Sequence, residues 1–79
     1  MELYANKSGE SNVKKYELKP DGIIVRFINN EVYEYNYQRT GKKHVENMKQ
    51  MAQAGEGLGT YISVVTKYGY NRQLRWNTE

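Results

Sequence analysis

The chain contains no cysteine and a single histidine among its 79 residues. The absence of cysteine excludes disulfide bonds and thiolate zinc sites, and one imidazole leaves too few nitrogen ligands for an ordinary zinc centre. We therefore expect no metal ion and no other cofactor. A domain of this size buries only about 60% of its unfolded surface, so we expect one domain with a thin core. Small domains without disulfide bonds or structural metal ions often gain stability by oligomerising, which predicts a homo-oligomer, either a dimer or a tetramer.

Long apolar segments are missing as well. No apolar run approaches the roughly 18 to 20 residues of a membrane span. The start, Met1-Glu2-Leu3-Tyr4, lacks the basic and apolar regions of a secretory signal. We expect a cytoplasmic protein that does not bind membranes. Disorder is excluded by the aromatic content of 13%, which includes eight tyrosines, although the mean hydropathy is -0.94.

Positive charge is concentrated in the second half of the chain. The net charge is +3, and residues 37–76 contain seven basic and two acidic side chains. This distribution favours an anionic partner such as a nucleotide, a nucleic acid or an acidic protein surface. A solvated basic face would account for the same charges equally well.

The first half of the chain has the residue pattern of β-strands. Residues 1–12 are polar and rich in turn formers, which predicts a flexible lead-in. Three segments with alternating or β-branched residues follow, separated by turn signals: Val13–Leu18, Ile23–Ile28 and Val32–Tyr37. They predict a three-stranded antiparallel β-meander. Three tyrosines of the last segment share one face, where we expect them to cover the core rather than to stack on bases: Tyr33, Tyr35 and Tyr37.

The second half changes to helical spacing. Val45, Met48 and Ala52 follow i, i+3, i+7 spacing, which predicts an amphipathic helix from about Lys42 to Ala54. After Thr60, apolar residues at positions 61, 65 and 68 predict a second helix, although the β-branched residues there also permit a strand. The predicted fold class is α+β, a three-stranded meander packed with two short α-helices.

Catalysis has little support in the sequence. His44 lies on the expected outer face of the first helix, whereas a general base needs a positioned partner and a shielded pocket. Glu31 and Glu34 are close in sequence but point to opposite sides of a strand. We expect a protein that is not an enzyme.

The glycine-rich segment from Gly55 to Thr60 is the first candidate ligand site. Gly57 and Gly59 come just before a possible helix, and free backbone N–H groups at such a place commonly bind phosphates. The segment matches neither the P-loop nor the dinucleotide-binding fingerprint. A tight turn that lets two helices meet would explain these glycines without a ligand.

The C-terminal segment is the second candidate. Arg72 and Arg75 are interleaved with aromatic residues that include Trp76. Aromatic rings can stack on bases while guanidinium groups bind phosphates, so the segment suits a nucleotide or a single-stranded nucleic acid. For Trp76 alone we favour packing on the domain or on a neighbouring subunit. The predicted domain comprises residues 13–76, with this segment as its basic aromatic tail.

Several short motifs resemble those of the KTSC-domain family. They occur along residues 11–68 in this order: Ser11-Asn12-Val13, Tyr16, Ile23-x-Val25-x-Phe27, Tyr33-x-Tyr35, Gly57-Leu58-Gly59-Thr60-Tyr61-Ile62 and Tyr68. Family members have a serine near the start, an L-x-V-x-F strand, a Y-x-Y strand and a segment like G-L-N-x-x-I before the last helix. This chain departs from the pattern at Asn29-Asn30, where a hairpin glycine is usual, and at Gly59, where asparagine is common. The second departure leaves only backbone groups for a ligand at that position.

The resemblance implies a small α+β fold that occurs in many phage and bacterial proteins. Small phage proteins similar to this family include anti-CBASS sponges, which sequester the cyclic-nucleotide signals of bacterial anti-phage defence. The matching motifs imply a ligand site formed by Ser11, Asn12, Tyr16 and the backbone N–H groups of Gly57, Gly59 and Thr60. The chemistry of the tail adds Arg72, Arg75 and Trp76 to that set.

Our leading hypothesis is an oligomeric nucleotide sponge that binds a cyclic dinucleotide or oligonucleotide, such as a cGAMP-like signal. Such a protein of phage origin would serve immune evasion in the host cytoplasm. Two other functions remain open, a nucleic-acid-binding module and an adaptor that blocks a host protein. Nucleic acid is the less favoured partner.

Overall fold

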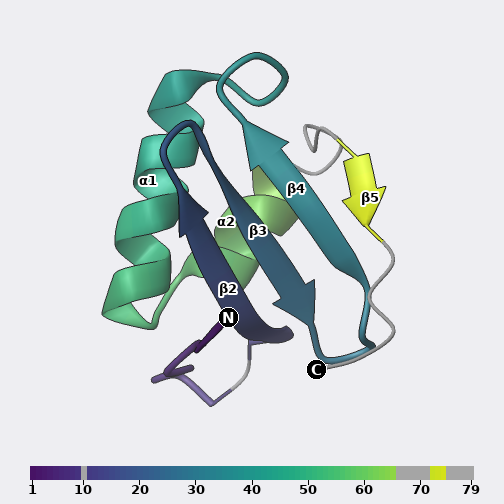
Figure 1. The fold of residues 1–79 in the computed structure, drawn as a ribbon. Helices are drawn as coiled ribbons and strands as arrows, with labels where there is room; N and C mark the ends of the chain where they lie inside the picture. Colours follow the sequence, from purple (N-terminus) through teal and green to yellow (C-terminus); the bar gives the residue numbers. More distant parts are fainter. Residues whose placement is uncertain (10, 66–71, 75–79) are drawn as a thin grey trace.

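The described residues of the protein fold into one antiparallel β-sheet with two helices against one of its faces (Figure 1). The computed structural model describes residues 1–9, 11–65 and 72–74. The elements are β1 (Glu2–Leu3), β2 (Val13–Lys19), β3 (Gly22–Phe27), β4 (Val32–Asn36), α1 (Lys42–Ala54), α2 (Leu58–Val64) and β5 (Arg72–Leu74). The strands lie side by side in chain order, β1-β2-β3-β4-β5. The predicted α+β class and its two helices are confirmed.

The predicted meander forms the centre of the sheet as β2, β3 and β4. The described sheet has more strands than the three that we expected, because β1 pairs with β2 and β5 pairs with β4. The β1 strand has two residues and β5 has three. Segments this short contain no period-two pattern, so the sequence alone does not reveal them.

The residues before Val13 differ from the predicted flexible lead-in. Tyr4 is only 6% exposed and belongs to the hydrophobic core. Its backbone N–H donates to the carbonyl of Lys14 at 3.0 Å, and the N–H of Lys7 donates to the carbonyl of Gly55 at 2.8 Å. These contacts attach the segment to β2 and to the end of α1. The domain therefore begins before Val13.

The core lies between the sheet and the two helices. Tyr16, Val25 and Tyr33 are cross-strand neighbours and share the face that the helices cover. Tyr35 lies on the same face and is 1% exposed. The helices contribute five buried hydrophobic residues to this core: Val45, Met48, Ala52, Leu58 and Ile62. The expected role of the β4 tyrosines in covering the core is confirmed.

The β3–β4 hairpin turns without glycine. Asn30 takes the left-handed conformation with φ 71°, which asparagine tolerates better than most residues. The Asn29 Oδ1 accepts the N–H of Glu31 at 3.0 Å, and the Asn30 Oδ1 accepts a hydrogen bond from Arg26 Nη2 at 2.9 Å. These side-chain bonds show how two asparagines replace the usual hairpin glycine.

The bounds of α1 agree with the prediction, and its C-terminal cap is Gly55, at a φ of 79°. Its N-cap is Gly41, without a side-chain hydrogen bond. The second predicted helix is confirmed as α2. It begins at Leu58 rather than after Thr60, because the chain turns at Gly57, which has a φ of 85°. Residues 66–71 lie outside the described residues. Within the described part, no helix is long and apolar enough to cross a membrane.

Tyr37 connects the end of β4 to α1. Its hydroxyl donates to Glu46 Oε2 at 2.5 Å, and Lys49 Nζ lies 3.4 Å from the same oxygen. The Tyr37 hydrogen bond, with help from Lys49, lowers the pKa of Glu46, and the bond to Glu46 raises the pKa of Tyr37. Lys49 also donates to the carbonyl of Lys19 at 2.6 Å, so one cluster links α1 to the β2–β3 turn and to the end of β4.

Candidate functional site

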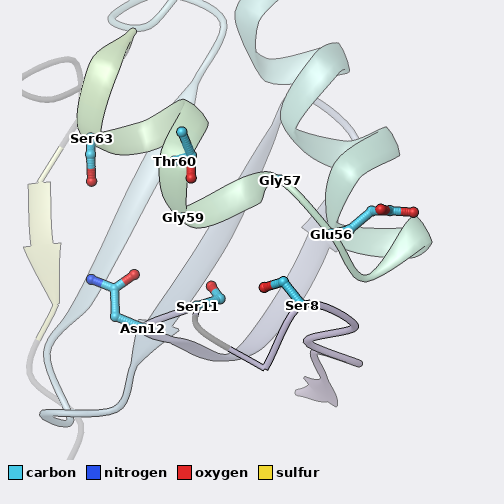
Figure 2. A pocket seen from close by; sticks show the side chains of 8 residues that line it. All are labelled: Ser8, Ser11, Asn12, Glu56, Gly57, Gly59, Thr60 and Ser63. Carbon is cyan, nitrogen blue, oxygen red and sulfur yellow. The ribbon is translucent and has the colours of Figure 1, made fainter.

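A pocket with a volume of about 510 Å³ lies between the loop that precedes β2 and the segment of residues 56–63, which includes most of α2 (Figure 2). Eight residues line it: Ser8, Ser11, Asn12, Glu56, Gly57, Gly59, Thr60 and Ser63. Five of the nine residues that we selected as ligand-site candidates are therefore together in one pocket. They come from two segments that are more than 40 residues apart in the chain.

The first wall of the pocket is formed by Ser8, Ser11 and Asn12 of the loop before β2, and hydrogen bonds within the protein hold Ser11 and Asn12 in place. The Ser11 N–H donates to Asn6 Oδ1 at 3.0 Å, and the Ser11 Oγ accepts the N–H of Val13 at 3.1 Å. The carbonyl of Asn12 accepts the N–H of Ile28 at 2.8 Å. Hydrogen bonds to Asn6, Val13 and Ile28 therefore fix the positions of Ser11 and Asn12. Asn12 is nevertheless exposed to solvent.

The second wall is the segment from Glu56 to Ser63. Tyr4 fixes its beginning, because the Leu58 N–H donates to the buried Tyr4 hydroxyl at 3.1 Å. The Tyr61 N–H donates to the carbonyl of Gly57 at 3.0 Å in the first turn of α2. One of the backbone N–H groups within the expected ligand-binding segment is thus occupied by the protein itself.

Gly59 is the place where the two walls meet. A Cβ atom at this position would lie 2.8 Å from Ser11 Oγ and 2.9 Å from Asn12 Oδ1. Cβ atoms in proteins essentially never approach another atom that closely. A side chain here would displace both groups, so the glycine permits the close approach of the loop to α2. This gives a structural reason for glycine where the KTSC pattern has asparagine.

The described residues that line the pocket are glycines and residues with polar or acidic side chains, and none of them is a lysine, arginine or histidine. Figure 2 shows the side chains of Ser8, Ser11, Asn12, Thr60 and Ser63 directed into the space between the walls. The Glu56 carboxylate points away from them. Hydroxyl and carboxamide groups both donate and accept hydrogen bonds, so the site suits a ligand with many uncharged polar atoms.

The structure does not place Tyr16 in this pocket. Its ring is on the helix-facing side of β2, is 6% exposed and packs in the core. Burial, with a smaller contribution from Glu2, raises its pKa. The motif match was therefore misleading for this residue, since its role in the fold is packing. Of the three tail candidates, Arg72 of β5 is described only by its backbone, which pairs with Glu34 of β4, and Arg75 and Trp76 lie outside the described residues.

Three lining residues were missed by the sequence analysis: Ser8, Glu56 and Ser63. Ser63 is four residues after Gly59 and three after Thr60, so helical spacing would have placed it on the same face had the start of α2 been known. Ser8 carries no such signal, because it reaches the pocket only through the tertiary fold, in which the neighbouring Lys7 N–H donates to the carbonyl of Gly55.

His44 lies outside this pocket and joins the two helices. Its Nδ1 is 2.8 Å from the Tyr61 hydroxyl, which also accepts a hydrogen bond from Asn47 Nδ2 at 3.2 Å. The three groups are half-buried. His44 thus has a structural partner in Tyr61. Within the described residues, no group of three or more acidic or histidine side chains could hold a metal ion.

Comparisons of the chain with protein-family models, with curated proteins and with solved structures found no match. The resemblance to the KTSC-domain family therefore depends on the short motifs alone. The spatial meeting of two of those motifs is an independent structural observation.

Proposed function

We propose that the protein is a non-catalytic sponge that sequesters a cyclic di- or oligonucleotide signal, with the pocket between residues 8–12 and 56–63 as part of its binding site. One observation carries the proposal. The two motifs for which the KTSC resemblance implies ligand contacts, Ser11-Asn12 and Gly57 to Thr60, line the same pocket.

The dimensions and the rigidity of the pocket support this proposal. Its volume of about 510 Å³ is within the range of roughly 300 to 1,000 Å³ that is usual for small-molecule sites. Both walls are held by hydrogen bonds that do not involve a ligand. A preformed site loses less conformational entropy on binding, which favours the tight binding that sequestration needs.

We propose further that the sponge is a homo-oligomer and that its binding site is shared between subunits. A pocket on a 79-residue chain has little depth, and a second copy would enclose more of a cyclic ligand. Arg72, Arg75 and Trp76 of the tail are the proposed contacts for its phosphates and bases. The proposed place of action is the cytoplasm of a bacterial host, where such signals are produced.

Isothermal titration calorimetry with a panel of cyclic di- and trinucleotides tests this function. We expect saturable binding of at least one ligand, and chromatography should recover that ligand intact after prolonged incubation. Thr60→Val removes a pocket hydroxyl without changing the side-chain shape and should weaken binding by about tenfold, as expected for one lost hydrogen bond. The control is Val64→Thr, the reverse exchange at an exposed position of α2 outside the pocket, which should bind as the wild type does.

Absence of binding across the whole panel would refute the proposal. A gel shift with polynucleotides whose affinity falls steeply with salt would instead indicate the nucleic-acid-binding module. Recovery of a defined host protein in a pull-down, together with no nucleotide binding, would indicate the adaptor.

A further inference from the structure

The pocket differs from a phosphate site in the groups that its described walls present. Phosphate-binding sites in proteins commonly use arginine, lysine or several converging backbone N–H groups. Here the side chains directed into the pocket are uncharged hydroxyls and one carboxamide, those of Ser8, Ser11, Asn12, Thr60 and Ser63. The one charged residue among the described lining residues is Glu56, which is acidic and whose carboxylate points away from these side chains.

The energetic consequence favours a neutral group in the pocket. A charged group that leaves water needs a compensating charge or several charge-assisted hydrogen bonds, and otherwise its transfer is costly. A nucleobase edge and a ribose present neutral donors and acceptors, which hydroxyl and carboxamide groups can pair one by one. The side chains of the walls are therefore complementary to the nucleoside part of a nucleotide rather than to its phosphates.

Asn12 is best suited to read the base. Its backbone is held by the bond from Ile28, while its side chain is exposed and directed toward α2 across the pocket. A carboxamide offers one donor group and one acceptor in a plane, the pattern that pairs with a base edge such as that of adenine. The neighbouring Ser11 and the facing Thr60 and Ser63 offer hydroxyls of the kind that bind ribose oxygens.

We propose that this pocket receives the uncharged part of the ligand, a nucleoside base with its ribose, and that Asn12 determines which base is accepted. The phosphates then lie outside the described walls. This inference depends on the proposed function for the ligand class, and it assigns the part of that ligand that enters the pocket.

Titrations with the separate parts of a nucleotide test which part of the ligand the pocket binds. Free adenosine and guanosine, and separately inorganic pyrophosphate, are titrated into the isotope-labelled protein and followed by amide NMR. We expect one of the nucleosides to shift the amide signals of Ser11, Asn12, Gly59 and Ser63 at 50 mM and at 500 mM NaCl alike, and pyrophosphate to leave them unchanged. Shifts at these amides with pyrophosphate and not with either nucleoside would overturn the inference.

The substitution Asn12→Asp separates base reading from simple charge repulsion. It replaces the carboxamide donor with a second acceptor at the same size, and we expect at least about a tenfold loss of affinity for the preferred base, retained at 500 mM NaCl. Gln38→Glu is the control, because it makes the same change at an exposed residue that does not line the pocket. A loss that disappears at high salt, or an equal loss in the control, would contradict the role of Asn12.

The two proposals fail in different ways. If a cyclic nucleotide binds and pyrophosphate competes for the pocket while nucleosides do not, the sponge function stands and this inference is refuted. If no cyclic nucleotide binds and a nucleoside still shifts the pocket amides, the sponge function is refuted and the nucleoside site stands.

Discussion

The substitution Gly55→Ala should strongly destabilise the protein, because two separate effects act at this position. Gly55 has φ 79°, in the left-handed region that alanine adopts at a cost of about 1 to 2 kcal/mol. A Cβ here would lie 2.5 Å from the Cβ of Ala5, and such overpacking costs about 1 to 3 kcal/mol. The carbonyl of Gly55 also accepts the Lys7 N–H, so displacement of the loop would weaken that bond as well.

The expected loss is a large share of the total stability. The two costs sum to about 2 to 5 kcal/mol, and the lower entropy of the unfolded alanine variant offsets about 0.4 to 1 kcal/mol of this. We expect a net loss of about 1 to 5 kcal/mol. At about 0.05 to 0.15 kcal/mol per residue, the whole 79-residue chain has a stability of about 4 to 12 kcal/mol.

Urea unfolding followed by circular dichroism measures this loss, and Gly9→Ala is the matched control. Gly9 has a similar φ of 76°, but no described atom lies within 4 Å of a Cβ built there. The control should lose only about 1 kcal/mol, the cost of backbone strain. The double variant with Ala5→Gly should recover the contact part of the loss. Equal losses for Gly55→Ala and Gly9→Ala, with no recovery, would refute the assigned contact with Ala5.

Two further predictions concern tyrosine hydroxyls. Tyr4→Phe leaves the buried Leu58 N–H without its acceptor, so the free energy of unfolding should fall by about 1 to 3 kcal/mol in the same urea assay, and an unchanged value would contradict the role of this bond. Tyr37→Phe should reduce the loss of stability in acid. The Tyr37 hydroxyl holds the pKa of Glu46 below its ordinary value of 4.5, so this contribution is present above about pH 4.5 and is lost as pH falls through the lowered pKa. Thermal melts from pH 6 to pH 3 should therefore show a smaller decrease for the variant than for the wild type, and parallel curves would argue against it.

The central strands and α1 were predictable because their signals are local. The apolar spacing of Val45, Met48 and Ala52 placed α1 within the bounds that the structure shows. β-Branched residues and turn formers likewise located the strands of the meander. Period-two and period-3.6 patterns are visible along the chain whenever one face of a long element is buried.

The burial of Tyr4 and Tyr16 in the core was not predictable, because it depends on contacts between residues that are far apart in the chain. Tyr4 stands in a polar segment beside a two-residue strand, and its burial depends on pairing with β2 and on the N–H of Leu58, which is 54 residues away in the chain. Tyr16 is part of a motif that suggested ligand contact, and only the strand register shows that its ring faces the helices. A one-residue shift of register would have exposed it.

The amino-acid sequence by itself determined the α+β class, the central strands, the bounds of α1 and two short motifs with the chemistry of a ligand site. These follow from side-chain periodicity and turn preferences, which act between near neighbours. The tertiary structure decided that Ser11 and Asn12 lie against α2, that Gly59 allows this close approach, and that the described walls of the resulting pocket carry no positively charged side chain. Contacts of this kind join segments more than 40 residues apart, and they form only when the sheet and the helices bury their common core.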